Sequence, residues 1–259
     1  MSESVALNVD CMEYMRTLPD KAFDLAVVDP PYGGGFTEGG GCKGWFTRYR
    51  QDVNELPAER ERERERELEQ IRPAVRQIQT SRGQWHGKQK YHGEDKKIIS
   101  WDVAPGQDYF EELFRVSRNQ IIWGGNYFPL PPTRCFLIWR KTNIPINGFS
   151  MAPVEYAWTS FQDNAACCEF SSFRGEGAGK FHPTEKPIDL YSWIYSRYAK
   201  NSERILDTHL GSGSSRIAAY DAGLDFVGCE IDKTYFDLQE ERFAAHSAQG
   251  NLFLQEELF

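Results

Sequence analysis

The part of the chain that most constrains its fold is a strand-like segment, a glycine-rich turn and a helix-like segment in direct succession. Arg204–Asp207 is a short, mainly apolar strand, the turn Thr-His-Leu-Gly-Ser-Gly-Ser-Ser follows it, and a helical pattern begins at Ile217. Glu230 comes 23 positions after Asp207, behind another apolar run. Such a turn lets the backbone approach a nucleotide-like ligand, and an acidic residue about 20 positions on accepts hydrogen bonds from ribose hydroxyls. The turn has no third glycine and no Lys-Ser/Thr pair, so it matches neither a dinucleotide-binding fold nor a P-loop.

A second apolar run, Leu25–Val28, ends in Asp29-Pro30-Pro31-Tyr32. The two prolines stiffen a turn at the carboxyl end of this strand, which is where open α/β sheets bind ligands. The Asp29 carboxylate and the Pro30 carbonyl can accept two hydrogen bonds from an exocyclic amine, and Tyr32 can stack on the base that carries it. The alternative is a structural turn, in which Asp29 caps a neighbouring segment and Tyr32 packs in the core.

A third element is the segment His182-Pro183-Thr184-Glu185-Lys186-Pro187, which lies just before the strand that leads into the glycine turn. It heads an amphipathic helix whose apolar face carries Leu190, Trp193, Ile194 and Tyr198.

Together these elements resemble the S-adenosylmethionine-dependent DNA methyltransferases that methylate exocyclic amino groups. The tetrad lies near the amino terminus and the glycine turn near the carboxyl terminus, so the chain resembles their circularly permuted beta group. The resemblance covers about residues 5–32 and 98–259. It implies an α/β, class I methyltransferase-like (Rossmann-like) fold: a mostly parallel seven-stranded sheet with helices on both faces. We therefore expect a single catalytic domain over residues 1–259, with a helical and loop insertion at 33–97.

The resemblance also implies roles for individual residues. Asp29, Pro30, Pro31 and Tyr32 are the expected catalytic residues. The expected cofactor-binding residues are Asp10, Cys11, Asp29, His182, Thr184, Lys186, Asp207, Gly211, Gly213, Ser214, Ser215, Glu230 and Ile231. Asp10 is expected near the cofactor adenine, with a helix N-cap as an equal alternative.

The implied reaction is methyl transfer from S-adenosyl-L-methionine, leaving S-adenosyl-L-homocysteine, to N6 of an adenine flipped out of double-stranded DNA. In this family Asp at the first tetrad position usually accompanies adenine, and Ser more often accompanies cytosine N4. Cytosine N4, adenine in RNA and an inactive DNA-binding relative remain as alternatives. The reaction requires no metal and no cysteine nucleophile, and such enzymes are typical of bacterial or phage restriction-modification.

Composition indicates a chain that can bury a core. Apolar residues make up 40% of it and there are seven tryptophans. No apolar stretch approaches 18 residues, so we expect no membrane span, and the amino terminus lacks a basic, apolar signal sequence. The six cysteines form no C-x-x-C pair and no Cys/His metal spacing, which favours reduced thiols, no metal and a cytoplasmic location. The family resemblance implies that the enzyme associates with the nucleoid when it is on DNA.

The net charge of −8 is unevenly distributed. Seven basic residues and two acidic ones between Gln70 and Lys97 give this stretch a local charge of +5, with aromatic residues interleaved. That pattern suits phosphate contact and base stacking, and a solvated loop is the alternative. Only about twenty residues separate Phe161 from His182, too few for a recognition domain there, so the insertion is the candidate DNA-contacting element. Its expected DNA-binding residues are Arg82, Trp85, Lys88, Lys90 and Tyr91.

The remaining patterns predict secondary structure. We expect strands over 5–9, 23–28, 120–123, 136–139, 154–159, 204–207 and 226–229, with 154–159 paired to a further strand over 168–171. Helices are expected over 109–116 and, with a break near Pro73, over 57–79. The oligomeric state stays open, with a homodimer among the alternatives.

Overall fold

A computed structural model describes residues 2–33, 103–145, 152–172, 182, 184–199 and 203–256, without the side chains of 249–256. The chain divides into two units, of which one comprises Met1–Tyr32, Pro105–Asn143 and Pro153–Phe259, and the other Gly33–Ala104 and Ile144–Ala152. The structural description below concerns the first unit. The predicted helix over 57–79 and the predicted DNA contacts of the insertion lie outside the described residues.

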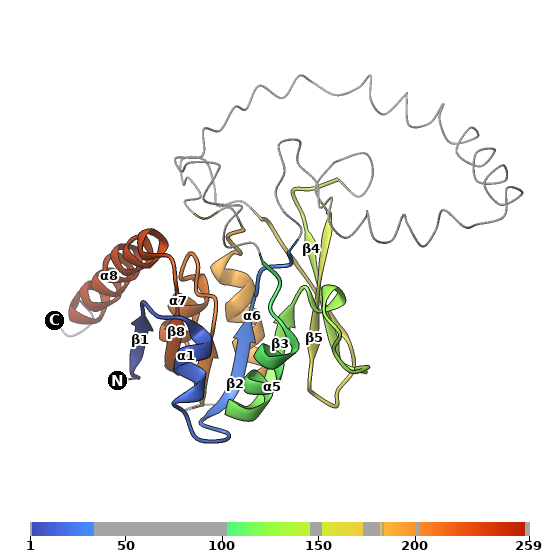
Figure 1. Cartoon of the computed structure of the whole chain (residues 1–259). Helices are drawn as coiled ribbons and strands as arrows, with labels where there is room; N and C mark the ends of the chain where they lie inside the picture. Colours follow the sequence, from blue (N-terminus) through green and yellow to red (C-terminus); the bar gives the residue numbers. More distant parts are fainter. Residues whose placement is uncertain are drawn as a thin grey trace, which may run out of the picture. The chain divides into compact units, whose positions relative to one another are not determined.

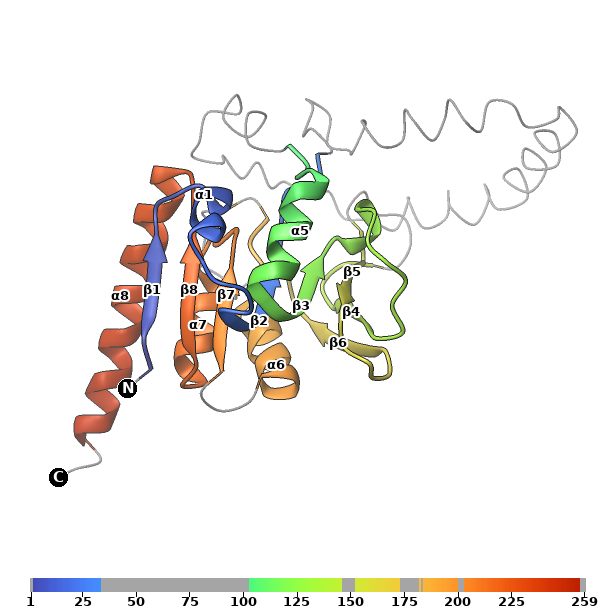
Figure 2. The same cartoon turned by 60° about the horizontal axis from the view of Figure 1, so that its bottom comes forward.

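The first unit is built on a mostly parallel sheet in the order β1-β8-β7-β2-β3-β5-β4-β6 (Figure 2). The strand bounds are β1 Ser4–Leu7, β2 Phe23–Val28, β3 Ser117–Trp123, β4 Phe136–Lys141, β5 Val154–Thr159, β6 Ala166–Phe170, β7 Arg204–Asp207 and β8 Asp225–Cys229. Only β5 runs antiparallel to its neighbours, β3 and β4. The expected α/β class and the mostly parallel sheet are thereby confirmed.

One detail of the expected sheet is wrong. The strand expected over 168–171 is present as β6, but it pairs in parallel with β4, Ile138 opposite Cys167, instead of pairing with β5, and the sheet of the described residues has eight strands in place of the seven that the resemblance implied. Both edges of β5 are already hydrogen-bonded. One edge pairs with β3, where Trp158 lies opposite Ile122, and the other pairs with β4, where Trp158 lies opposite Phe136. A strand with two partners has no edge to offer a third, so β6 extends the sheet beyond β4.

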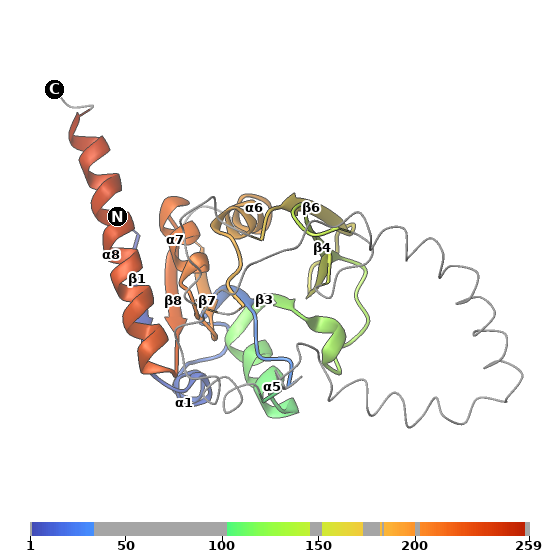
Figure 3. The same cartoon turned by 90° about the horizontal axis from the view of Figure 1, so that it is seen from above.

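Helices cover both faces of the sheet. The helix bounds are α1 Cys11–Arg16, α5 Gln107–Val116, α6 Ile188–Tyr198, α7 Ser214–Asp221 and α8 Lys233–Glu256, with a short 3₁₀ turn η1 at Gly125–Tyr127. Figure 3 shows α1 and α5 on one face and α6 and α7 on the other, with α8 beyond α7. None of the described helices combines the length and the apolar character that crossing a bilayer requires.

Alternating residues of the central strands supply two cores. Leu25 and Val27 of β2 face the core under α6 and α7, whereas Ala26 and Val28 face the core under α1 and α5. A strand buried on both faces reads as a continuous apolar run, which is why Phe23–Val28 was recognisable without any partner.

The parallel strands bring distant segments to one edge of the sheet. β1, β8, β7, β2 and β3 all run in the same direction, so their carboxyl ends meet at that edge. The helix that follows β7 packs on the face opposite to α1 and α5 (Figure 1). The boundary between β7 and β2 is therefore the switch point at which an open α/β sheet forms a ligand-binding crevice.

Candidate functional site

Asp29 lies where β2 ends, and both of its carboxylate oxygens have partners. The Tyr32 hydroxyl donates to Oδ1 at 2.7 Å, and the Lys186 ammonium binds Oδ2. Burial and the Asp29 carboxylate both raise the pKa of Tyr32 well above its usual value, so this residue is a hydrogen-bond donor throughout the working range. Two of the predicted tetrad residues are therefore joined directly, and Lys186 joins them from a remote segment.

The Tyr32 ring is held by aromatic neighbours and by a glycine. It stacks on Tyr127 with 4.8 Å between ring centroids and 22° between planes, and Phe128 meets it edge-on. Gly124 has a φ of +66°, and a Cβ there would lie 2.1 Å from Tyr32 Cε1. Glycine thus serves both the left-handed backbone and the close approach of the ring. Aromatic and glycine residues after β3 belong to the site and were missed, although Gly-Gly-Asn-Tyr-Phe behind an apolar strand was a visible signal.

The glycine turn is closed by Glu230. Gly211 N–H donates to Glu230 Oε2 and Asp232 N–H to Oε1, both at 2.8 Å. Burial raises the pKa of Glu230 despite these hydrogen bonds. Glu230 therefore lies at the glycine turn, and each of its oxygens keeps a lone pair for a further donor. Its role as a ribose acceptor stays a prediction.

Gly211 and Gly213 have φ values of +52° and +74°, which glycine adopts without strain. A Cβ on Gly211 would also lie 3.2 Å from the His182 ring. That ring packs edge-on against Tyr235 at 4.5 Å, and Thr184 Oγ1 lies 3.2 Å from His182 Nδ1. The structure therefore places His182 beside Gly211, with Thr184 next to the His182 ring, and the cofactor roles of both residues stay predictions.

Asp207 ends β7 and is buried. It accepts hydrogen bonds from the Ser215 hydroxyl and, at 3.0 Å, from His209 N–H. Burial raises the pKa of Asp207 to about 7. Behind the turn, the Tyr109 hydroxyl lies 2.6 Å from Thr208 Oγ1, which lies 2.9 Å from His209 Nδ1.

Asp10 caps helix α1. Its Oδ1 accepts hydrogen bonds from Met12 N–H at 2.7 Å and Glu13 N–H at 3.3 Å, so the N-cap alternative is realised. The cap uses Oδ1 alone, and the role of Asp10 near the adenine stays a prediction. Burial, and then Asp10, raise the pKa of Cys11 to about 12, so the thiol is not ionised at neutral pH, and its cofactor role stays a prediction.

The other predicted cofactor residues divide by exposure. Ser214 and Ser215 are buried in the first turn of α7, and Ser212 Oγ lies 3.1 Å from Ser214 Oγ. Ile231 is 63% exposed, so its side chain is accessible to a ligand. The predicted DNA-binding residues Arg82, Trp85, Lys88, Lys90 and Tyr91 lie outside the described residues.

Lys186 also contacts a carboxylate that the sequence analysis missed. Glu155 of β5 lies 3.2 Å from the Lys186 ammonium and 2.5 Å from that of Lys141, at the end of β4. Charged residues inside the apolar segments 136–141 and 154–159 were a signal, but nothing local shows that they meet. The resemblance implies that Lys186 binds the cofactor. In the structure its ammonium forms an ion pair with the Asp29 carboxylate.

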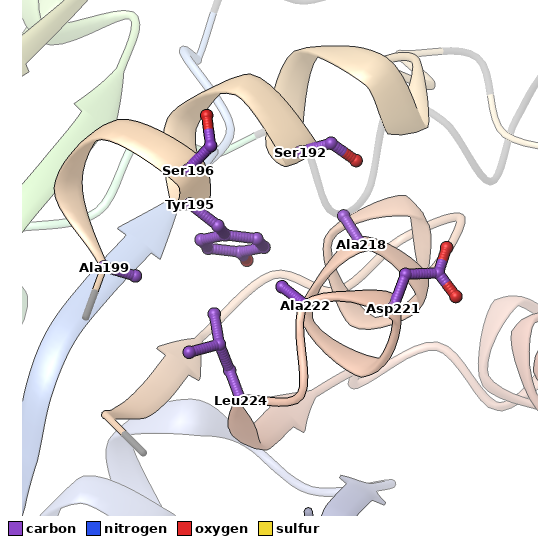
Figure 4. A pocket seen from close by; sticks show the side chains of 8 residues that line it. All are labelled: Ser192, Tyr195, Ser196, Ala199, Ala218, Asp221, Ala222 and Leu224. Atoms are coloured by element: carbon purple, nitrogen blue, oxygen red, sulfur yellow. The ribbon is translucent and has the colours of Figure 1, made fainter. Parts of the chain in front are cut away.

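The surface also has a hollow between α6 and α7, shown in Figure 4. Tyr195 lies at its centre among small side chains such as Ala218 and Ala222. None of the carboxylates at the sheet edge lines it, so we do not count it as part of the site. Among the described residues, no cluster of His, Cys, Asp and Glu could hold a metal ion.

The site as a whole suits a cationic, nucleoside-bearing cofactor. Four acidic residues lie at the carboxyl ends of the neighbouring parallel strands β1, β8, β7 and β2: Asp10, Glu230, Asp207 and Asp29. Lys186, a cation beside Asp29, is already paired with two carboxylates, those of Asp29 and Glu155. The remaining carboxylates complement a sulfonium and an ammonium group.

Comparison of the sequence with known proteins indicates the family of this chain. The family model for DNA methylases of the N6 and N4 type matches residues 80–241. The chain is 23% identical to the type II methyltransferase M2.MboI of Moraxella bovis, covering 90% of this chain and 85% of that one. It is 22% identical to the type II methyltransferase M.BglII of Bacillus subtilis, covering 95% and 70%. The solved complex of M1.HpyAVI with SAM aligns with a TM-score of 0.47 at 16% identity, covering 93% of this chain and 98% of that one. Because the family model matches more than half of its residues, this chain belongs to the S-adenosylmethionine-dependent DNA amino-methyltransferases of the N6-adenine and N4-cytosine family.

Proposed function

We propose that this DNA methyltransferase acts on N6 of adenine in double-stranded DNA. The observation that carries the proposal is the position of Asp29 and Tyr32 at the end of β2, beside β7, whose glycine turn is closed by Glu230. An acceptor for the amine thus lies next to the crevice in which the cofactor is expected. The preference for adenine over cytosine N4 rests on the family tendency for Asp at the first tetrad position.

The chemistry asks little of the protein beyond positioning. S-adenosylmethionine, when bound, supplies a methyl group on a sulfonium, which is already a strong electrophile. Asp207, Gly211 and Glu230 would hold this cofactor, and transfer of its methyl group to the base nitrogen, with S-adenosyl-L-homocysteine as leaving group, would leave the amine with one proton to lose. Asp29 and the Pro30 carbonyl draw the amine toward tetrahedral geometry, and Tyr32 orients the ring by stacking.

Lys186 is an electrostatic group and not the base in this scheme. Burial lowers the pKa of the ammonium, but the carboxylates of Asp29 and Glu155 outweigh burial, and the net pKa lies above its usual value. The amine therefore stays protonated at neutral pH and has no lone pair to take a proton. Asp29 is left as the acceptor of the proton that the methylated amine releases.

The proposed reaction also implies a cellular location, a DNA-contacting segment and cofactor-binding residues. We infer a cytoplasmic enzyme whose insertion over 33–97 contacts DNA, and a homodimer is among the assemblies we propose to test by sedimentation. The cofactor roles of Asp10, His182, Thr184, Asp207, Gly211, Ser215 and Glu230 are part of this proposal.

Expression in a host without DNA methylation tests the function directly. Mass spectrometry of the digested DNA should show N6-methyladenine. N4-methylcytosine in its place would support the alternative base, and a methylated RNA pool with unmodified DNA would support an RNA substrate. Calorimetric binding of S-adenosylmethionine without methyl transfer to either nucleic acid would indicate an inactive relative.

A further inference from the structure

Four charged side chains from four segments form a row that ends at Asp29. Lys141 pairs with Glu155 at 2.5 Å, Glu155 pairs with Lys186 at 3.2 Å, and Lys186 pairs with Asp29. The charges alternate, so the row is neutral as a whole. Its members come from the end of β4, from β5, from the segment before α6 and from the turn after β2.

The row is largely removed from water. The side chains of Lys186 and Lys141 are 4% and 9% exposed, that of Asp29 14% and that of Glu155 24%. Indole rings line it, because Lys186 Nζ lies 5.4 Å from the centre of the Trp123 ring and Lys141 Nζ lies 5.2 Å from that of Trp139. Buried ion pairs contribute little net stability compared with apolar side chains of similar size, so stability alone does not account for this arrangement.

The location of the row gives it a different role. Lys186 has two carboxylate partners from different segments, Asp29 in the turn after β2 and Glu155 in β5. Only Asp29 belongs to the tetrad Asp29-Pro30-Pro31-Tyr32. The second partner, Glu155, faces the ammonium from β5 through an ion pair at 3.2 Å, and its Oε2 makes no hydrogen bond among the described residues. The ammonium in turn takes Asp29 Oδ2, while Oδ1 receives the Tyr32 hydroxyl. The Asp29 carboxylate is thus contacted by Lys186 and Tyr32, and Glu155 is linked to it only through Lys186.

We propose that Glu155 is a positioning residue for methyl transfer, which acts through Lys186 to fix the carboxylate of Asp29. The proposal rests on the proposed role of Asp29 in that reaction. The role of Lys141 is to neutralise Glu155 at Oε1. All four side chains can then stay ionised while the row as a whole carries no net charge.

The charge states agree with this role. Burial raises the pKa of Glu155, but Lys186 and Lys141 outweigh burial, and the net pKa lies below its usual value. Around Lys186 the titratable neighbours are Asp29 from the turn after β2, Glu155 from β5 and, less directly, the hydroxyls of Tyr32 and Tyr191. Of these, only the two carboxylates carry charge at neutral pH, and removing Glu155 leaves burial opposed by Asp29 alone.

The test is the variant Glu155→Gln, which keeps the shape and removes the charge. We expect kcat to fall at least tenfold, while KM for DNA and the calorimetric Kd for S-adenosylmethionine stay within threefold. We also expect the alkaline limb of the kcat profile to move down by about one pH unit, because Lys186 then loses its proton more easily. The variant Glu155→Asp, which restores the charge on a shorter stem, should recover part of kcat and of the alkaline limb.

A double-mutant cycle separates positioning from a merely structural role. Lys186→Met should itself lower kcat, and adding Glu155→Gln to it should cost little more, because the effect of Glu155 passes through Lys186. Glu169→Gln is the matched control: it removes a carboxylate from the exposed pair with Arg140 on the adjacent strands, 3.1 Å apart, and should leave every parameter unchanged.

Several outcomes would overturn the proposal. These are wild-type kcat and pH profile in Glu155→Gln, or full additivity with Lys186→Met. If Glu155→Gln does not fold, a wild-type kcat in Lys186→Met has the same force, because the effect of Glu155 is proposed to pass through Lys186. Titration of the Lys186 Nζ resonance in ¹⁵N-lysine-labelled protein tests the link even in a wild-type protein that transfers no methyl group. An unshifted Lys186 pKa in Glu155→Gln contradicts the proposal, whereas inactivity of the wild type contradicts only the proposed function.

Discussion

The ammonium of Lys186 binds the carboxylate of Asp29 across 157 positions of sequence. This contact joins the segment before α6 to the turn after β2, at the boundary where the sheet changes the side on which its helices pack. Asp29 is thereby oriented before any substrate arrives, and preorganised charge of this kind does not need to rearrange during the reaction.

Replacing Asp29 with Asn should abolish methyl transfer. The amide keeps the size of the side chain but removes the charge that draws the amine toward tetrahedral geometry, and we expect at least a hundredfold fall in the single-turnover rate. Lys186 retains Glu155 as a partner, so the fold should survive. The calorimetric Kd for S-adenosylmethionine should stay within a few-fold. A variant that turns over at a near-normal rate would remove Asp29 from the catalytic role.

Replacing Glu230 should have the opposite effect. Glu230→Ala removes the acceptor that holds Gly211 N–H and, in our proposal, the ribose hydroxyls of the cofactor. Loss of two hydrogen bonds to a charged acceptor costs on the order of 2–4 kcal/mol, which raises Kd by about thirty-fold or more. Asp237→Asn, on the exposed side of α8, is the control and should bind normally. An unchanged Kd in Glu230→Ala would place the ribose elsewhere.

Cofactor affinity should rise with pH around neutrality. Burial raises the pKa of Asp207 to about 7, so a large share of this carboxyl is protonated below pH 7 in the free protein. A cationic ligand favours the ionised form, and binding must then release a proton. Calorimetry at pH 6 and pH 8 should show tighter binding at pH 8, and at pH 6.5 the enthalpy should depend on the ionisation heat of the buffer. Asp207→Asn should remove both effects, and a pH-independent Kd in the wild type would contradict the assignment.

Two tyrosine hydroxyls should respond differently to removal. The Tyr195 hydroxyl, next to the hollow of Figure 4, is buried and has no hydrogen-bond partner among the described residues, whereas the Tyr109 hydroxyl bonds Thr208 at 2.6 Å. Tyr195→Phe should raise the free energy of unfolding by about 1 kcal/mol, and Tyr109→Phe should lower it by a similar amount. Denaturation in urea measures both. Destabilisation by Tyr195→Phe would show that its hydroxyl has a partner, such as a buried water.

The sequence was informative wherever a feature is local. The strand over Phe23–Val28, the glycine turn behind Asp207 and the acidic residue behind β8 are each encoded by neighbouring residues, and each was found. The pairing of β6 and the contact of Glu155 with Lys186 depend on which strands lie side by side, and no local sequence pattern predicts the order of strands in the sheet. Asp10 shows a third case, because one carboxylate pattern fits both an N-cap and a ligand contact.

DNA binding should depend on the basic part of the insertion. Replacing Arg82, Lys88 and Lys90 with Ala should weaken binding and flatten its salt dependence, because each lost phosphate contact reduces the slope of log K against log salt by about 0.9. The matched control replaces Arg60, Arg62 and Arg64, which changes the charge by the same amount within a run where Glu alternates with Arg. Those arginines have acidic neighbours on both sides, so their loss should leave the slope nearly unchanged.

The two triple variants together separate local contact from overall charge. The chain carries a net charge of −8, and either variant makes it −11, so a slope that changes equally in both would reflect long-range repulsion between protein and DNA. A change confined to the Arg82, Lys88 and Lys90 variant assigns the phosphate contacts to that stretch. Cofactor affinity should be the same in both, because the Gly211–Glu230 closure is built on other strands. If neither variant alters the slope, the positive charge that an acidic enzyme needs to hold DNA must come from another surface or from a partner subunit.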